Sequence, residues 1–208
     1  MGEAARCAVK MHHVTKTFGK VIANKDINLE LKNGEILALL GENGSGKTTL
    51  MNMLSGIYFP DHGEIYVKGE EVTIRSPKDS FALGIGMIHQ HFKLVDVFSA
   101  MDNVVIGAEG KRIKPKELKE KILELTKKFG LEVEPEKKIY NMSVSEKQTV
   151  EILKVLYRNA DILILDEPTA VLTPQETQKL FAILRRMKEQ GSAIIIITHK
   201  LNEVMEIS

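Results

Sequence analysis

The sequence predicts an α/β fold with a mainly parallel core sheet, an antiparallel strand-rich edge and an inserted helical lobe. Three observations support this prediction: short strand-like runs fill the first third of the chain, helical periodicity marks the middle, and bare apolar runs flank an amphipathic helix near the end. Bare apolar runs are typical of strands buried in a parallel sheet. The 208 residues, 43% of them hydrophobic, suffice for one large domain with an inserted lobe.

The first third of the chain is expected to supply the antiparallel edge. Its short apolar or alternating runs cover residues 8–14, 27–31, 35–40 and 64–68. The sequences Asn33-Gly34 and Asp61-His62-Gly63 are turn signals between them. This part of the chain therefore predicts several short strands joined by turns.

The middle and the end of the chain carry helix signals. Pro115 suits the first position of a helix with apolar residues at helical spacing, and Gly130 ends it. A second helix, at 174–190, begins where Thr173 can cap and Glu176 can close a capping box. The apolar runs 162–165 and 193–197 lie on either side of this second helix and are predicted to be buried strands.

A glycine-rich string at 41–49 predicts a phosphate cradle. It follows the predicted strand 36–40 and opens a helix at 47–56, so backbone N–H groups and a helix N-terminus surround an anion. Lys47 supplies a fixed positive charge, and the Thr48 hydroxyl suits a magnesium ion. A turn that binds nothing would not explain Lys-Thr after the third glycine. The expected phosphate-binding residues are Gly41, Asn43, Gly44, Ser45, Gly46, Lys47, Thr48 and Thr49. The cradle therefore predicts that the chain is a P-loop NTPase.

Two carboxylates follow the predicted strand 162–165. Ligands collect at the carboxyl edge of such sheets, so Asp166 is placed to hold magnesium through water. Glu167 can polarise the water that attacks the γ-phosphate. Acidic residues after a strand often only cap a helix, but a P-loop in the same chain favours catalysis.

These motifs resemble the ATP-binding cassette (ABC) ATPases, which drive membrane transporters, over nearly the whole chain. The further marks are Gln90 after the strand 84–89, the string Met142-Ser-Val-Ser-Glu146, and His199 after the strand 193–198. The resemblance implies one ABC ATPase domain over 1–208. Its RecA-like core would span 1–91 and 160–208, and its helical lobe about 92–159. The closing strands of the family are expected to be missing.

The resemblance also assigns roles to single residues. Phe18 occupies the place of the aromatic residue that stacks on adenine, and the rival interpretation is a core phenylalanine. Gln90 corresponds to the glutamine that ligates magnesium and senses the helical lobe. His199 corresponds to the histidine that contacts the γ-phosphate and helps to place the attacking water. Glu167, His199 and Gln90 are thus the expected catalytic residues, and Thr48, Gln90 and Asp166 the expected magnesium ligands.

Such ATPases work in pairs, and each ATP lies between the P-loop of one cassette and the signature motif of the other. Ser143 and Glu146 predict a capping box that opens the helix 147–158, so Ser143 and Ser145 are expected to face a partner's nucleotide. Ser145 replaces the second glycine of the usual signature, so a side chain stands where the backbone would approach the partner's phosphate most closely. Thr149 replaces an arginine, and Thr173 replaces the aspartate that communicates between sites.

The phrases around 150–159 and 165–176 resemble the first half of double-cassette ATPases that power sugar and nucleoside import. The resemblance implies an ATP- and Mg²⁺-dependent ATPase bound to a permease, a second cassette and an upstream solute-binding protein, at the cytoplasmic face of the membrane. Such proteins are about twice as long or longer, so the chain is expected to be a fragment, a truncated reading frame or a reduced relative. The solute is not encoded here, because it contacts the permease and the binding protein.

Composition narrows the alternative functions that the sequence leaves open. A net charge of +1 and the lack of a basic stripe argue against nucleic acid as a partner, and therefore against a soluble ABC-type ATPase of DNA repair or translation. The single cysteine and the absence of a long apolar stretch indicate a chain that is soluble when isolated, in a reducing compartment.

The segment 91–105 carries apolar residues that fit a permease-docking patch and the core of the lobe equally well. A catalytically weak, regulatory ATP-binding cassette remains the other alternative.

Overall fold

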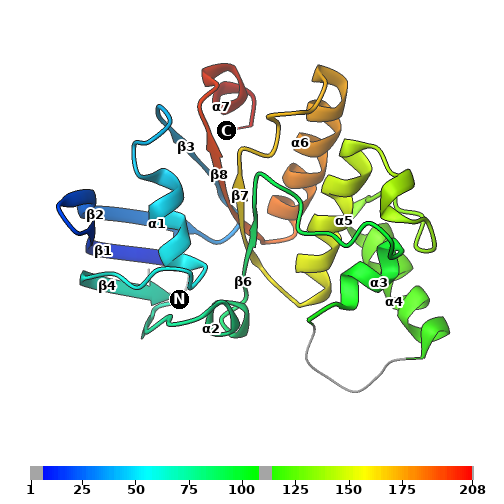
Figure 1. Ribbon diagram of the computed structural model, residues 1–208, viewed down its shortest axis with the longest axis horizontal. Coiled ribbons are helices and arrows are strands. Elements are labelled where there is room, and N and C mark those ends of the chain that lie inside the picture. The colour runs from blue at the N-terminus through cyan, green and yellow to red at the C-terminus, as the bar shows by residue number, and fades with distance from the viewer. Residues whose placement is uncertain (1–6, 108–113, 208) are drawn as a thin grey trace.

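The computed structural model describes residues 7–107 and 114–207, and its strands form two four-stranded sheets (Figure 1). The antiparallel sheet has the order β2-β1-β4-β5 and the parallel sheet the order β3-β8-β7-β6. The strands of the antiparallel sheet are β1 (Cys7–Phe18), β2 (Val21–Lys32), β4 (His62–Val67) and β5 (Glu70–Val72). Those of the parallel sheet are β3 (Ile36–Leu40), β6 (Ile85–Ile88), β7 (Ile162–Asp166) and β8 (Ala193–Thr198).

Five of the seven helices in the described residues fall into three groups (Figure 1). Helix α1 lies between the two sheets, α6 covers the far side of the parallel sheet, and α3, α4 and α5 gather beside α6. Their bounds are α1 (Lys47–Leu54), α2 (Pro77–Ala82), α3 (Ala100–Val105), α4 (Pro115–Phe129), α5 (Val144–Tyr157), α6 (Pro174–Glu189) and α7 (Leu201–Ile207), with a 3₁₀ turn at Ile139–Asn141. The chain thus has the α/β architecture with an antiparallel sheet and a helical lobe that the sequence predicts.

Strand β7 explains why the central sheet must be covered on both faces. Ile162 and Ile164 point into a core shared with α1 and the antiparallel sheet. Leu163 and Leu165 alternate with them and enter a second core with α5 and α6. Because successive side chains of a strand point to opposite faces, a continuous apolar run is stable only with a layer on each side.

Helix α1 ties the P-loop to the antiparallel sheet. Its residues Leu50, Met51, Met53 and Leu54 are buried in the same core as Val9 and Met11 of β1. Burying such side chains contributes about 1.5–3 kcal/mol each. The start of α1, and with it the phosphate cradle, is therefore held rigidly at the carboxyl end of β3.

The helical lobe meets the parallel sheet at a glycine. A Cβ added to Gly86 of β6 would overlap Val155 Cγ1 of α5 and lie 3.2 Å from Ala160 Cβ. Only glycine therefore lets α5 approach β6 this closely. The expected lobe at about 92–159 contains α3, α4 and α5, while its residues 108–113 lie outside the described residues.

Most predicted elements are confirmed, and their bounds differ in places. The predicted strand 8–14 is the first part of the longer strand β1, and the predicted strand 27–31 is the last part of the longer strand β2; the two strands form a hairpin. Helix α5 begins at Val144, three residues earlier than predicted, because Ser143 is its N-cap. Strand β5 and helices α2, α3 and α7 were not predicted, since their periodic patterns are too short to recognise.

Candidate functional site

The P-loop leaves β3 at Leu40 and enters α1 at Lys47. Gly46 is the N-cap of α1 and has a φ of 88°, in the left-handed region that favours glycine. A Cβ at Gly46 would strike the Ala23 carbonyl oxygen and lie 2.9 Å from Asn24 Nδ2. Asn24 Nδ2 in turn donates to the Gly46 carbonyl at 3.2 Å, so β2 fixes the end of the loop.

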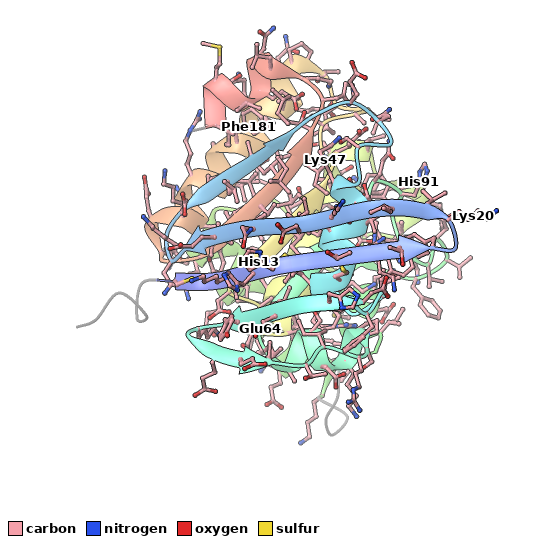
Figure 2. All side chains as sticks on the ribbon, turned by 90° about the vertical axis from the view of Figure 1, so that its left-hand side faces the viewer. His13, Lys20, Lys47, Glu64, His91 and Phe181 are labelled. Carbon is pink, nitrogen blue, oxygen red and sulfur yellow. The ribbon has the colours of Figure 1, made fainter. Side chains whose placement is uncertain are left out.

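The P-loop binds the Lys47 ammonium group through its own carbonyl and hydroxyl oxygens. Lys47 Nζ donates to the carbonyl oxygens of Gly41 and Glu42, both at 2.7 Å, and to Ser45 Oγ at 3.1 Å. A Cβ at Gly41 would lie 3.1 Å from Ser45 Oγ and 3.6 Å from Lys47 Nζ. Figure 2 shows Lys47 at the start of α1, behind the antiparallel sheet. The cradle therefore presents a fixed positive charge beside a helix N-terminus.

Thr48 and Asp166 meet across the sheet edge. Thr48 Oγ1 lies 3.2 Å from Asp166 Oδ2, although the two residues are 118 positions apart. Burial raises the pKa of Asp166, and the nearby Glu167 charge raises it further, whereas Thr48 and Lys47 lower it. A hydroxyl and a carboxylate side by side form a donor set of hard oxygens, which magnesium prefers.

Glu167 lies between Gln90 and His199. His199 Nδ1 is 3.1 Å from Glu167 Oε1, and Gln90 Nε2 donates to Glu167 Oε2 at 3.3 Å. Glu167 has a φ of 46°, which is uncommon for a residue with a side chain, and its N–H donates to the Ile197 carbonyl at 3.0 Å. In this conformation the carboxylate contacts both Gln90 and His199. The structure thus brings Lys47, Thr48, Gln90, Asp166, Glu167 and His199 to one edge of the parallel sheet.

Phe18 lies at the end of β1 and is not a core residue. Its side chain is 43% exposed and meets Tyr58 edge-on, with ring centroids 5.0 Å apart. Lys16 Nζ lies 5.5 Å from the Phe18 ring centroid. The rival interpretation of Phe18 as a core residue is therefore wrong, and an accessible aromatic ring is available for stacking.

The start of α5 is built as the capping box that the sequence predicts. Ser143 Oγ accepts from the Glu146 N–H at 3.2 Å, and Glu146 Oε2 accepts from the Ser143 N–H at 2.7 Å. A hydrogen bond from Lys137 keeps the pKa of Glu146 below its usual value. The N–H groups of Val144 and Ser145 lie in the first turn, where the helix itself offers no acceptor.

Ser143 and Ser145 lie apart from the P-loop. They line a cavity of about 610 Å³ between the helical lobe and α6. Among the described residues, no hydrogen bond joins either serine to the P-loop, Glu167 or His199. Two departures from the family pattern, Thr149 in the signature and Thr173 after the catalytic edge, have structural partners here. Thr149 Oγ1 donates to the Ser145 carbonyl at 2.9 Å, and Thr173 caps α6 in a box with Glu176.

Sequence reasoning did not find the residues that support this edge from behind. Glu203 of α7 is buried and receives hydrogen bonds from Thr169 and Thr198, which follow Asp166 and precede His199 along the chain. Asn24 and Tyr58 were also missed. The available signal was the position of two threonines within two residues of Glu167 and His199, which periodicity does not register.

Comparison with known proteins gives the family. The family model described as ABC transporter matches residues 24–170. The chain is 52% identical over 208 residues to the nucleoside import ATP-binding protein NupA of Lactococcus lactis, covering 99% of this chain and 41% of that protein. It is 51% identical over 190 residues to the guanosine import ATP-binding protein NupO of Bacillus subtilis, covering 90% of this chain and 37% of that protein. The chain therefore spans about two fifths of the length of these curated relatives.

A solved structure agrees with the sequence comparison. The cbiO1 protein of Clostridium perfringens, part of the ABC transporter complex cbiONQ, superposes with a TM-score of 0.84 at 30% identity, over 97% of this chain and 82% of that one. The predicted fold class is confirmed by this superposition and by the two-sheet architecture. The family model covers residues 24–170, which is most of this chain, and the P-loop lies beside Asp166 and Glu167 at one sheet edge. The chain therefore belongs to the ABC transporter family of ATP-binding cassettes.

Proposed function

We propose that this chain binds ATP with Mg²⁺ and hydrolyses it as the ATP-binding cassette of an importer. The observation that carries the proposal is the single sheet edge where Lys47 in its glycine cradle lies near the Glu167–His199 pair. Phosphate binding and water activation need these two groups side by side. The import role is supported by the relatives, which are nucleoside and guanosine import ATP-binding proteins.

The phosphates would occupy the cradle made by Gly41, Asn43, Gly44, Ser45, Gly46, Lys47, Thr48 and Thr49. Backbone N–H groups and the start of α1 favour an anion there. Lys47 adds a charge-assisted contact, which is stronger than a neutral hydrogen bond. Phe18 would stack on the base, and its exposed ring face fits any nucleobase.

Thr48, Asp166 and Gln90 would hold the magnesium ion. Thr48 Oγ1 and Asp166 Oδ2 are 3.2 Å apart, close enough to share one small cation, and the Gln90 carbonyl oxygen would be a third ligand. Bound magnesium would neutralise charge on the β- and γ-phosphates. The raised pKa of Asp166 reflects its burial, and a cation beside it would favour the ionised form.

Glu167 would act as the general base for the attacking water. Its Oε1 is 3.1 Å from His199 Nδ1 and its Oε2 accepts from Gln90, so both oxygens are held in place. A carboxylate fixed in this way can accept a proton from a water that lies between it and a γ-phosphate. His199 would contact the γ-phosphate from the same side.

Pairing with a second cassette would complete each site. The start of α5, with Ser143 and Ser145, lies away from the chain's own P-loop and offers free N–H groups to an anion on another molecule. Ser145 places a hydroxymethyl group at this point. We therefore expect nucleotide to bind in one chain and hydrolysis to need a partner.

The permease partner would contact the surface around 91–105. Val97 is 65% exposed and Phe98 43% exposed, whereas Leu94 and Met101 pack against buried residues of the lobe. The segment thus divides between the two predicted roles. No helix in the described residues is long and apolar enough to cross a membrane. A permease would anchor the chain peripherally at the cytoplasmic face, and a solute-binding protein would deliver the solute.

A second candidate is a regulatory cassette that binds ATP while a partner hydrolyses it. The observation that favours it is the engagement of Thr173 in the cap of α6, in place of the aspartate by which paired sites communicate. Phosphate release with ATP and magnesium, with and without a chelator, separates the two candidates. Magnesium-dependent turnover above a Glu167→Gln control supports hydrolysis, and ATP binding without turnover supports the regulatory cassette.

A further inference from the structure

Behind the catalytic edge lies a buried carboxylate that no assigned role uses. Glu203 belongs to α7, is 8% exposed and faces the ends of β7 and β8. Its Oε1 accepts from Thr169 Oγ1 at 2.6 Å, and its Oε2 accepts from Thr198 Oγ1 at 2.8 Å. A buried charge is costly unless it is paired and hydrogen-bonded, so this arrangement needs a reason beyond capping a short helix.

Lys200 completes the network. Lys200 Nζ lies 3.0 Å from Glu203 Oε1 and donates to the Thr169 carbonyl at 3.2 Å. The Lys200 N–H donates to Thr198 Oγ1 at 3.1 Å. Burial opposes the charge of Glu203, but the hydrogen bonds from Thr169, Lys200 and Thr198 outweigh it, and the pKa of Glu203 lies below its usual value. The carboxylate therefore stays ionised at neutral pH and keeps accepting from both threonines.

The two threonines flank the two residues proposed to act on water. Thr169 is two residues after Glu167, and Thr198 is directly before His199. The contact between Glu167 Oε1 and His199 Nδ1, at 3.1 Å, joins the same two loops on the side of the cleft. The loops are thus joined in front by Glu167 and His199 and behind by Glu203, with Lys200 adding a bond to the Thr169 carbonyl.

We propose that Glu203 is the positioning residue that holds Glu167 and His199 at their working separation. It contacts neither of them and acts only through Thr169 and Thr198. Loss of one of its oxygens as an acceptor loosens the loop after β7 relative to the loop after β8, because one of the two threonines loses its bond to Glu203. Because a misplacement of a reacting group by a fraction of an ångström is costly, hydrolysis falls while nucleotide binding at the P-loop is unaffected. The proposal rests on the hydrolytic function proposed above.

The test compares isosteric and conservative variants in the full chain. Glu203→Gln keeps the shape and removes the charge, while Thr169→Val and Thr198→Val each remove one donor. Thr169→Ser and Thr198→Ser keep the donors, and Glu206→Gln is the control on the same helix, because Glu206 bonds to Gln178 at the surface. The Glu203→Gln and valine variants are expected to lower kcat by about ten- to a hundredfold with KM within about twofold of wild type. The serine and Glu206→Gln variants are expected to keep wild-type kcat.

A second measurement does not depend on turnover. The His199 ring resonances, assigned with His199→Gln in a proton–carbon NMR spectrum, are expected to move in Glu203→Gln and Thr169→Val and to stay in place in Glu206→Gln. Unmoved resonances in folded Glu203→Gln protein overturn the proposal, as does wild-type kcat in Glu203→Gln, or a rise in KM with kcat unchanged. A wild-type chain without turnover at any protein concentration, including concentrations at which two chains pair, would refute the hydrolytic function alone, and the NMR result would still decide the role of Glu203.

Discussion

Lys47→Ala tests the phosphate cradle, and the structure sets the size of the effect. The ammonium group has three donors, and the loop already supplies three acceptors, the carbonyls of Gly41 and Glu42 and the hydroxyl of Ser45. Bound phosphate must therefore replace neutral acceptors of the Lys47 ammonium group. Only the difference in free energy between the bonds to phosphate and the bonds to the loop contributes to ATP binding. A hydrogen bond to a charged group contributes about 1.5–3 kcal/mol net, which predicts an ATP affinity roughly ten- to a hundredfold weaker in the variant.

The effect on folding should be smaller. The freed carbonyl of Glu42 belongs to an exposed residue, so water can replace the ammonium group there, and we expect a loss of at most about 1 kcal/mol in unfolding free energy. Titration with a labelled ATP analogue, alongside thermal unfolding, measures both quantities. Lys20→Ala is the matched control, because Lys20 is an exposed lysine at the tip of the β1–β2 hairpin (Figure 2). Wild-type affinity in folded Lys47→Ala protein would refute the cradle.

Three further substitutions test other parts of the account. Ser145→Gly should raise turnover and ATP-dependent dimerisation without changing monomer affinity, because we propose that the residue faces a partner's nucleotide. Equal turnover at every protein concentration would leave Ser145 as a helix residue only. Phe18→Ala should weaken ATP and GTP binding alike, by about tenfold, in a nucleotide titration, whereas Phe18→Tyr should not; unchanged affinity would remove the stacking role. Gly86→Ala should destabilise the fold by about 1–3 kcal/mol in denaturant, with part of the loss recovered by Val155→Ala, and an undiminished midpoint would contradict the packing of α5 on β6.

The fold was largely predictable because its strongest sequence signals are long amphipathic helices and uninterrupted apolar runs. The apolar runs that became β7 and β8 have no polar residue to expose, so only a covered parallel sheet accommodates them. The helix at 115–129 combines a first-turn proline with a terminal glycine in the left-handed conformation, and both bounds match the prediction. Shorter elements such as α7 carry too few turns for periodicity to identify.

The site was predictable where one segment carries the chemistry and not where distant segments meet. The string 41–49 specifies backbone geometry through its own glycines, and Asp166 and Glu167 follow directly from a strand end. The support of Gly46 by Asn24, and of both catalytic loops by Glu203, depends on contacts between residues far apart in the chain. The segment 91–105 illustrates the same limit, because periodicity could not separate exposed Val97 from packed Leu94.

The measurement that tests the central claim most directly is phosphate release by Glu167→Gln, with ATP binding measured on the same protein. Glutamine keeps the shape of the side chain and can still contact His199 and Gln90, but it cannot accept a proton from water. We predict ATP affinity within about twofold of wild type and turnover lower by about 10²–10⁴. Wild-type turnover in the Glu167→Gln protein would show that Glu167 is not the base and that hydrolysis does not take place at this sheet edge in the way proposed.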